Sequence, residues 1–248
     1  MKWALLAVVL ALAFAFSWPE PGSANPLTVA MLDSNVFIVG DGYTCSGTLV
    51  RDDAVLTAHH CLGSLKPDVD ASVVPNLALP LGLSVYAAGG QVEAVVSIMA
   101  DSVGYDVAVV KLAGPMAPPA IVARFDSAPM EAGDEVWLTG NPLQEGWVAF
   151  WGHVAKVSHE DQGEGCDAKN KVGATLHWDL LLDLRGYPGD SGGGVWDSRG
   201  ILRGLYFGAN VEANCSMTPE QIEAAPATWG LAVAPQSVAE VLRQAGVL

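Results

Sequence analysis

Basic residues are scarce in this sequence of 248 residues. Only 12 Lys and Arg stand against 27 Asp and Glu, which gives a formal net charge of −15. A surface of this charge repels phosphate groups, so the composition argues against nucleic acid as a partner. Charged residues of both signs make up only 16% of the chain and hydrophobic residues 51%, which excludes an intrinsically disordered protein.

Cysteines are few, and none of them forms a Cys-x-x-C pair, which argues against a structural zinc site. The four cysteines allow three disulfide connectivities, and their spacing alone selects none of them: Cys45, Cys61, Cys166 and Cys215. Long hydrophobic runs are missing beyond residue 20, so no later segment is expected to span a membrane.

The first 24 residues have the layout of a secretory signal peptide. Lys2 provides a positive start, residues 3–16 are an uncharged apolar run, and residues 17–24 are rich in proline and small residues. We predict that residues 1–24 are removed and that the mature chain, 25–248, is secreted or periplasmic without stable membrane insertion. An uncleaved membrane anchor is the alternative, although the apolar run is short for a span. Export to an oxidising compartment would allow the cysteines to form disulfides.

Short apolar runs separated by Gly, Asp and Asn follow from residue 34 onward, at intervals of about ten residues, which predicts an all-β barrel or sandwich. A proline-rich stretch at 113–130 is predicted to link two β halves, about 34–112 and 131–248. Four apolar residues near the end recur with helical spacing and predict a C-terminal helix: Val238, Val241, Leu242 and Ala245. The expected strands cover residues 36–39, 44–50, 54–57, 92–99, 106–112, 135–139, 147–157, 178–182, 194–196, 201–207 and 228–233.

Three short segments carry side chains suited to nucleophilic catalysis. His60 stands beside Cys61, Asp106 opens an apolar run, and Ser191 lies in Gly-Asp-Ser-Gly-Gly. A serine hydroxyl is a good nucleophile only when a base removes its proton and a third group orients that base. Because the His and the Asp lie in one β half and the Ser in the other, we expect the site in the cleft between the halves.

Each of these residues has a competitor in the sequence. Gly-x-Ser-x-Gly also describes the nucleophile elbow of α/β hydrolases, but that fold needs a His after the Ser, and the last His here is His177. Asp101 lies near Asp106 but precedes no continuous strand, and His59 is expected to pack or to lie at the surface. No metal or cofactor is expected, and the other histidines are interpreted as surface or core residues: His153, His159 and His177.

Together these segments resemble the chymotrypsin/trypsin-like serine proteases. Residues 57–61 (Thr-Ala-His-His-Cys) match that family's Thr-Ala-Ala-His-Cys, Asp106 matches the Asp of its Asp-Ile-Ala-Leu strand, and residues 189–193 match its serine loop. The second half is similar to the Do-type periplasmic proteases in residues 140–143 (Gly-Asn-Pro-Leu) and 230–235 (Gly-Leu-Ala-Val-Ala-Pro). No PDZ modules of the kind that many Do-type proteins carry are expected.

The resemblance implies two six-stranded antiparallel β-barrels with a C-terminal α-helix, and a monomeric serine endopeptidase that acts on polypeptides. It implies His60, which adjoins Cys61 as in the motif, as the base and Asp106 as the group that orients it. Ser191 would be the nucleophile that forms an acyl-enzyme, and the N–H groups of Gly189 and Ser191 would form the oxyanion hole. A catalytically inactive binding protein on the same fold is the alternative.

Disulfides and substrate contacts are also implied by the resemblance. Cys45 would bridge to Cys61 beside the catalytic His, which leaves Cys166 and Cys215 for each other. The position at the base of the specificity pocket is Arg185, so the acidic residue that favours Lys or Arg is missing. Apolar or small substrate side chains are therefore expected, with acidic side chains as the alternative if Arg185 faces the pocket. The segment that pairs with the substrate should be Leu205, Tyr206, Phe207 and Gly208.

Activation in trypsin-like enzymes places a new amino terminus, Ile-Val-Gly-Gly, beside the Asp that precedes the serine. That Asp is Asp190 in this chain, and residues 25–35 contain no such sequence. We therefore expect activity without zymogen cleavage. Backbone N–H groups or a basic residue should then satisfy the carboxylate of Asp190, because a buried unpaired carboxylate is costly.

Overall fold

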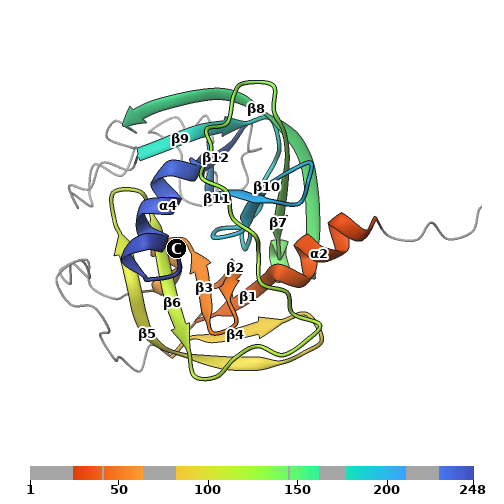
Figure 1. Cartoon of the computed structure of the whole chain (residues 1–248), viewed down its shortest axis with the longest axis vertical. Helices are drawn as coiled ribbons and strands as arrows, with labels where there is room; N and C mark the ends of the chain where they lie inside the picture. The colour runs from red at the N-terminus through yellow and green to blue at the C-terminus, as the bar shows by residue number, and fades with distance from the viewer. Residues whose placement is uncertain (1–24, 41, 64–81, 145, 162–176, 211–228) are drawn as a thin grey trace, which may run out of the picture.

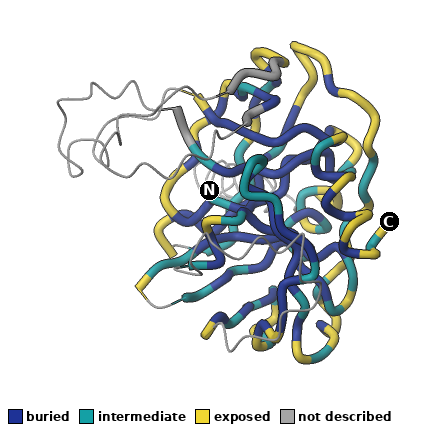
Figure 2. The backbone as a smooth tube through the Cα atoms, turned by 90° about the vertical axis from the view of Figure 1, so that its left-hand side faces the viewer, coloured by how far each residue is buried: buried dark blue, intermediate teal, exposed yellow. Residues whose placement is uncertain are grey.

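The computed structural model describes residues 25–40, 42–63, 82–144, 146–161, 177–210 and 229–248. Within these residues, 12 strands form two closed antiparallel barrels of six strands each (Figure 1). The backbone tube is mostly buried along the strands and mostly exposed in the connections between them (Figure 2). The predicted all-β fold of two barrels is confirmed.

His60 and Asp106 both lie in connections between strands of the first barrel. Its strands pair in the order β1-β2-β3-β6-β5-β4. The central β3 is buried along its whole length and leads into a short 3-10 turn, η1 (His59–Leu62). Because η1 follows a fully buried strand, the turn is anchored at its start. The strands are β1 (Asn35–Val39), β2 (Thr44–Arg51), β3 (Ala54–Thr57), β4 (Ser84–Ala87), β5 (Val92–Ser102) and β6 (Val107–Leu112).

Ser191 lies in a loop of the second barrel. Its strands pair in the order β10-β11-β12-β9-β8-β7, and the serine loop connects β9 to β10. A strand after the serine excludes the nucleophile elbow of α/β hydrolases, in which a helix follows. The strands are β7 (Glu135–Gly140), β8 (Val148–Asp161), β9 (His177–Leu182), β10 (Gly194–Asp197), β11 (Leu202–Asn210) and β12 (Trp229–Val233), with the short 3-10 turn η2 (Pro142–Gln144) between β7 and β8.

The predicted C-terminal helix is α4 (Pro235–Gln244). It follows the second barrel, but Val238, Val241 and Leu242 are buried in a cluster made largely by the first. Accordingly, α4 contacts β5 and β6 as well as β11. The end of the chain therefore ties the two barrels together.

Two elements differ from the predictions. The strand β4 was not predicted, because its four residues include only two buried side chains, too few to show an alternating pattern. The helix α2 (Pro26–Ser34) was not expected; it begins after Asn25, whose Oδ1 accepts the N–H of Leu27 at 3.0 Å. Asn at this position is a strong helix start signal, and Pro26 needs no donor in the first turn.

The signal peptide, the pairing of Cys166 with Cys215, and part of the proposed second half lie outside the described residues and stay predictions. Among the residues that are described, no helix is both long enough and apolar enough to cross a membrane.

Candidate active site

His60 and Asp106 form a pair held by two contacts. Nδ1 of His60 lies 2.6 Å from Oδ2 of Asp106, and the N–H of His60 donates to Oδ1 at 2.8 Å. Because a carboxylate can only accept, Nδ1 carries the proton and Nε2 of a neutral ring remains an acceptor. The Asp106 side chain is 5% exposed and that of His60 48% exposed, so the acid is sheltered while the imidazole reaches solvent.

Asp106 lies just before β6 rather than in it, which corrects the expected start of this strand. Its backbone has φ of 55°, a left-handed conformation that is uncommon for residues other than glycine. The N–H of Asp106 donates to the carbonyl of Val103 at 3.2 Å, and its own carbonyl accepts the N–H of His59 at 3.1 Å. This turn conformation lets the carboxylate meet η1 instead of continuing the strand.

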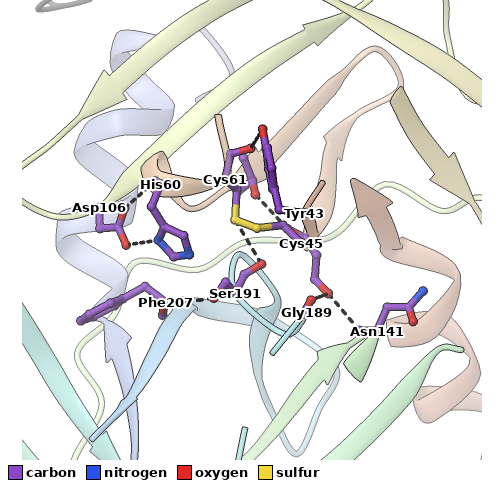
Figure 3. The surroundings of a disulfide bond; sticks show 11 residues. Tyr43, Cys45, His60, Cys61, Asp106, Asn141, Gly189, Ser191 and Phe207 are labelled. Carbon is purple, nitrogen blue, oxygen red and sulfur yellow. Dashed lines mark hydrogen bonds and ion pairs between the residues drawn. A yellow bond between two sulfur atoms is a disulfide. The ribbon is translucent and has the colours of Figure 1, made fainter. Parts of the chain in front are cut away.

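Ser191 approaches the pair from the second barrel, and the His60 ring lies between Asp106 and Ser191 (Figure 3). The Ser191 carbonyl accepts the N–H of Ser46 in β2 at 2.8 Å, which joins the serine loop to the first barrel. Its Oγ donates to the carbonyl of Phe207 at 3.3 Å rather than to His60. Hydrogen bonds of catalytic groups are often misaligned before the substrate binds and tighten afterwards.

The close approach of the two barrels requires glycine at position 192. A Cβ there would lie 2.2 Å from the carbonyl oxygen of Ser46 and 2.3 Å from Oγ1 of Thr57. Backbone φ at Gly192 is also +85°, which disfavours any side chain. The glycines around the serine are therefore needed for the loop to reach the first barrel.

The N–H groups of Gly189 and Ser191 make no hydrogen bond to any residue that the structure describes. Gly189 has φ of +101°, and a Cβ there would lie 2.5 Å from the carbonyl oxygen of Asn141. The carbonyl of Gly189 is held by Oγ of Ser46 at 2.7 Å, and the same Oγ accepts the N–H of Asn141 at 2.9 Å. The loop thus leaves two N–H groups beside the serine hydroxyl.

Sequence reasoning missed the part played by Ser46 and Asn141. Ser46 follows Cys45, whose disulfide the resemblance implied, and Asn141 stands in Gly-Asn-Pro-Leu, one of the segments that resemble Do-type proteases. The signal was therefore present, but the bonds join residues 95 and 143 positions apart in the chain. A pattern of neighbouring residues does not reveal such contacts.

The expected disulfide between Cys45 and Cys61 is present and joins β2 to η1. The hydroxyl of Tyr43 donates to the carbonyl of Cys61 at 3.1 Å and holds the same turn. Cys45, His60 and Cys61 also bring ligand atoms within 4.8 Å of one another. They do not suit a metal ion, since the sulfurs are bonded to each other and Nδ1 of His60 binds Asp106.

Asp190 is fully buried beside the serine. Its Oδ2 accepts the N–H of Tyr187 at 2.8 Å, whereas Oδ1 has no hydrogen-bond partner in the part of the chain that the structure describes. Burial raises the pKa of Asp190 to about 7, although the N–H of Tyr187 acts in the opposite direction. Of the two expected partners, the structure provides a backbone N–H group, and it shows no ion pair between Asp190 and another described residue.

Strand β11 carries the residues expected to meet the substrate. The Leu205 side chain is fully buried in the core, so a substrate side chain cannot reach it. Phe207 is also buried, and its carbonyl accepts from Oγ of Ser191. Gly208 is half-buried, and Arg185, in the loop before the serine, is exposed.

The side chain of Tyr206 fills the space between Gly186 and Gly230. A Cβ on Gly186 would lie 2.0 Å from the Tyr206 hydroxyl oxygen, and one on Gly230 would lie 3.0 Å from its ring. Tyr206 itself is only 2% exposed. Burial raises its pKa, and the nearby carboxyl of Asp190 adds to this shift.

Two barrels that bring a serine from one and a histidine–aspartate pair from the other to their junction define the class of the protein, a serine endopeptidase. Comparison with known families agrees with this class. The chain matches the model of the trypsin-like peptidase domain over residues 45–205, well over half of its length. It belongs to the trypsin-like peptidase family, and polypeptides are its substrates.

Several solved structures share the fold. The Rv3671c protease from M. tuberculosis in its active form aligns with a TM-score of 0.66 and 20% identity, covering 92% of this chain and 88% of that one. A mutant of Rv3671c from M. tuberculosis H37Rv in an inactive form gives 0.65 and 20%, covering 93% and 95%. The serine endoprotease from Yersinia pestis gives 0.61 and 17%, covering 92% and 68%. A sequence search of curated proteins found no match.

Proposed function

We propose that the mature chain, residues 25–248, is an exported, monomeric endopeptidase that cleaves polypeptides through an acyl-enzyme. Oγ of Ser191 attacks the scissile carbonyl carbon while Nε2 of His60 takes the hydroxyl proton. Asp106 keeps Nδ1 of His60 protonated and stabilises the imidazolium that forms. Nε2 then gives the proton to the leaving amine, and water hydrolyses the acyl-enzyme by the same route.

The N–H groups of Gly189 and Ser191 stabilise the negative oxygen of the tetrahedral intermediate. Loss of one donor of this kind typically lowers kcat by about 100- to 1,000-fold. Gly189 is buried, and a buried N–H group without a partner costs free energy. An inactive binding protein would have no reason to keep that cost, and this observation carries the proposal.

For the substrate, we infer small apolar side chains before the cleaved bond. The phenol of Tyr206 fills the space between Gly186 and Gly230, so little room is left beside Ser191 for a long side chain. Position 185 holds Arg instead of an acidic residue, which argues against Lys or Arg as the substrate residue before the cleaved bond. A preference for acidic side chains would show instead that the exposed Arg185 contacts the substrate.

Export is supported by the layout of residues 1–24 and by the disulfide between Cys45 and Cys61. Disulfides persist in oxidising compartments such as the periplasm and the extracellular space. A secreted or periplasmic location follows, and mass spectrometry of the exported protein should find Asn25 as its first residue. Retention of residues 1–24 in a membrane fraction would support the anchored alternative.

The proposed role of Ser191 is tested by Ser191→Ala with an unfolded protein as substrate. Ser198→Ala is a matched control, since Ser198 is an exposed serine seven positions later in the same region. We expect the first variant to lose hydrolysis and the control to keep it. Activity within about tenfold of wild type in a folded Ser191→Ala protein would contradict the proposal.

A further inference from the structure

Two adjacent histidines in η1 each bind a different aspartate. His60 binds Asp106, while Nδ1 of His59 lies 2.7 Å from Oδ1 of Asp101. Asp101 is on β5, next to its end, and Asp106 is the last of the four residues between β5 and β6. The turn η1 is therefore bound by side chains at both ends of the β5–β6 connection.

The pair of His59 and Asp101 is more sheltered than an ordinary surface contact. The Asp101 side chain is 4% exposed and that of His59 is 21% exposed. The hydrogen bond to Asp101 raises the pKa of His59, although burial acts in the opposite direction. Because a carboxylate only accepts, His59 donates from Nδ1. A buried carboxylate without such a donor would be costly, so the two side chains hold each other in place.

Backbone contacts link the pair of His59 and Asp101 to the proposed catalytic pair of His60 and Asp106. Asp101 stands opposite Ala108 in the register of β5 with β6, so its position is linked to the strand that follows Asp106. The N–H of His59 donates to the carbonyl of Asp106 at 3.1 Å. His59 thus contacts Asp101 with its side chain and Asp106 with its backbone, and its neighbour in the chain is His60.

We propose that His59 and Asp101 are positioning residues, which fix η1 against β5 so that His60 meets Asp106 in the geometry needed for proton transfer. This inference rests on the proposed function of His60, Asp106 and Ser191. The side chains of His59 and Asp101 do not touch the reacting atoms, and they act through the placement of His60. Small displacements of a catalytic group can lower kcat by up to about a hundredfold.

The position of the donor nitrogen gives a sharp test. In His59→Asn the side-chain amide lies near the place of Nδ1, so the bond to Asp101 can form. In His59→Gln the amide lies one bond further out, near the place of Nε2, and it misses Asp101. We expect His59→Asn to keep kcat within about threefold, and His59→Gln to lose about ten- to a hundredfold in kcat with little change in KM.

The rates are expressed per active site, counted by labelling with a fluorophosphonate, so that misfolded protein does not enter kcat. His153→Gln is the control: Nδ1 of His153 lies 3.3 Å from Oδ2 of Asp183 in a half-exposed pair on the second barrel. It should keep wild-type kcat. Equal kcat in His59→Asn and His59→Gln, whether normal or reduced, would overturn the proposal.

A readout independent of activity comes from proton NMR of the imidazole N–H groups. The wild type should show two low-field signals, one for His59 bound to Asp101 and one for His60 bound to Asp106. His59→Asn should lose one signal and keep the other in place, whereas His59→Gln should lose one and displace or broaden the other. An unchanged His60 signal in His59→Gln would overturn the positioning role. An inactive, unlabelled wild type with both signals would instead refute the proposed function.

Discussion

Ser46 shows how one hydroxyl group can hold three segments of an active site together. Its Oγ donates to the carbonyl of Gly189 and accepts the N–H of Asn141, while its N–H binds the carbonyl of Ser191. All of these groups are buried or half-buried. Ser46 therefore holds the serine loop at two carbonyl groups, those of Gly189 and Ser191, and this loop carries both proposed oxyanion-hole N–H groups.

We therefore expect Ser46→Ala to lower kcat by about tenfold or more with a small effect on KM, since the loop that carries the proposed oxyanion-hole donors loses one of its anchors. Steady-state kinetics on a peptide substrate measures this. Ser34→Ala is the control, because the hydroxyl of the buried Ser34 donates to the carbonyl of Ala30 within α2, away from the serine loop. A normal kcat in Ser46→Ala would show that the loop holds its shape without this hydroxyl.

Tyr206 is the residue from which we derive the preference for small side chains. Replacing it in Tyr206→Ala removes the phenol between Gly186 and Gly230 and should open space beside Ser191. A profile of cleavage in a peptide library should shift from small to large apolar residues before the cut. Phe150→Ala, which removes an aromatic ring from β8, should leave the profile unchanged. The same profile in wild type and Tyr206→Ala would contradict the assignment.

The three residues that we propose as the triad could be selected from the sequence because each stands in a short motif. His59 was interpreted as a packing or surface residue, since nothing near it in the chain shows that Asp101 will lie 2.7 Å away. The same holds for the space-filling role of Tyr206. These roles depend on segments that meet only in the folded barrels, and a one-dimensional pattern does not contain them.

At the scale of elements, one buried arginine binds the end of the segment between the barrels, in addition to backbone hydrogen bonds along that segment. The guanidinium of Arg203, on β11, binds Oδ2 of Asp197 at 3.2 Å. It also donates to three backbone carbonyls of the inter-barrel segment, those of Asp126, Ala128 and Pro129. The predicted linker is therefore attached to the second barrel by a group that the sequence alone does not distinguish from a surface arginine.

Breaking such a buried network typically costs about 3 kcal/mol, so Arg203→Ala should lower Tm by roughly 6 to 12 °C. Arg203→Lys should rescue little, because one ammonium group cannot replace the planar fork of donors. Arg199→Ala is the control: Arg199 binds the same Asp197 oxygen at 2.7 Å but is largely exposed, so Tm should change little. Equal Tm shifts for Arg199→Ala and Arg203→Ala, measured by thermal unfolding, would contradict this account.

Eleven of the 12 described strands could be predicted because each is an apolar run bounded by turn residues. The four residues of β4 form too short a run. The arrangement as two six-stranded barrels came from the family resemblance. The strand order was not predicted, because it depends on contacts between distant segments. The helix α2 has a start signal in Asn25 and Pro26, but no secondary structure was predicted for this segment.

At the scale of the whole molecule, Asp190 makes stability depend on pH. Burial raises the pKa of this carboxyl from 3.8 to about 7, so between these values the folded protein binds a proton that the unfolded chain releases. The protonated carboxyl of Asp190 therefore contributes its full stabilisation of the folded state below pH 3.8, and this contribution is lost as pH rises through about 7. A pKa shift of this size corresponds to roughly 4 kcal/mol in the free energy of unfolding.

Asp190→Asn removes the titration and keeps a side chain of the same shape. We expect Tm of the wild type to fall, relative to that of Asp190→Asn, as pH rises from about 5 to about 8. The difference between the two proteins isolates this carboxyl from other titrating groups. Parallel Tm curves for the two proteins across this range would show that Asp190 is ionised throughout.

Covalent labelling of the wild type with a fluorophosphonate tests the central claim most directly. The probe reacts with a serine that a nearby base has activated, and peptide mapping locates the modified residue. We predict a single modification at Ser191, with none in Ser191→Ala and greatly slowed labelling in Asp106→Asn. Folded wild-type protein that stays unlabelled, or that is labelled at another serine, would contradict the account.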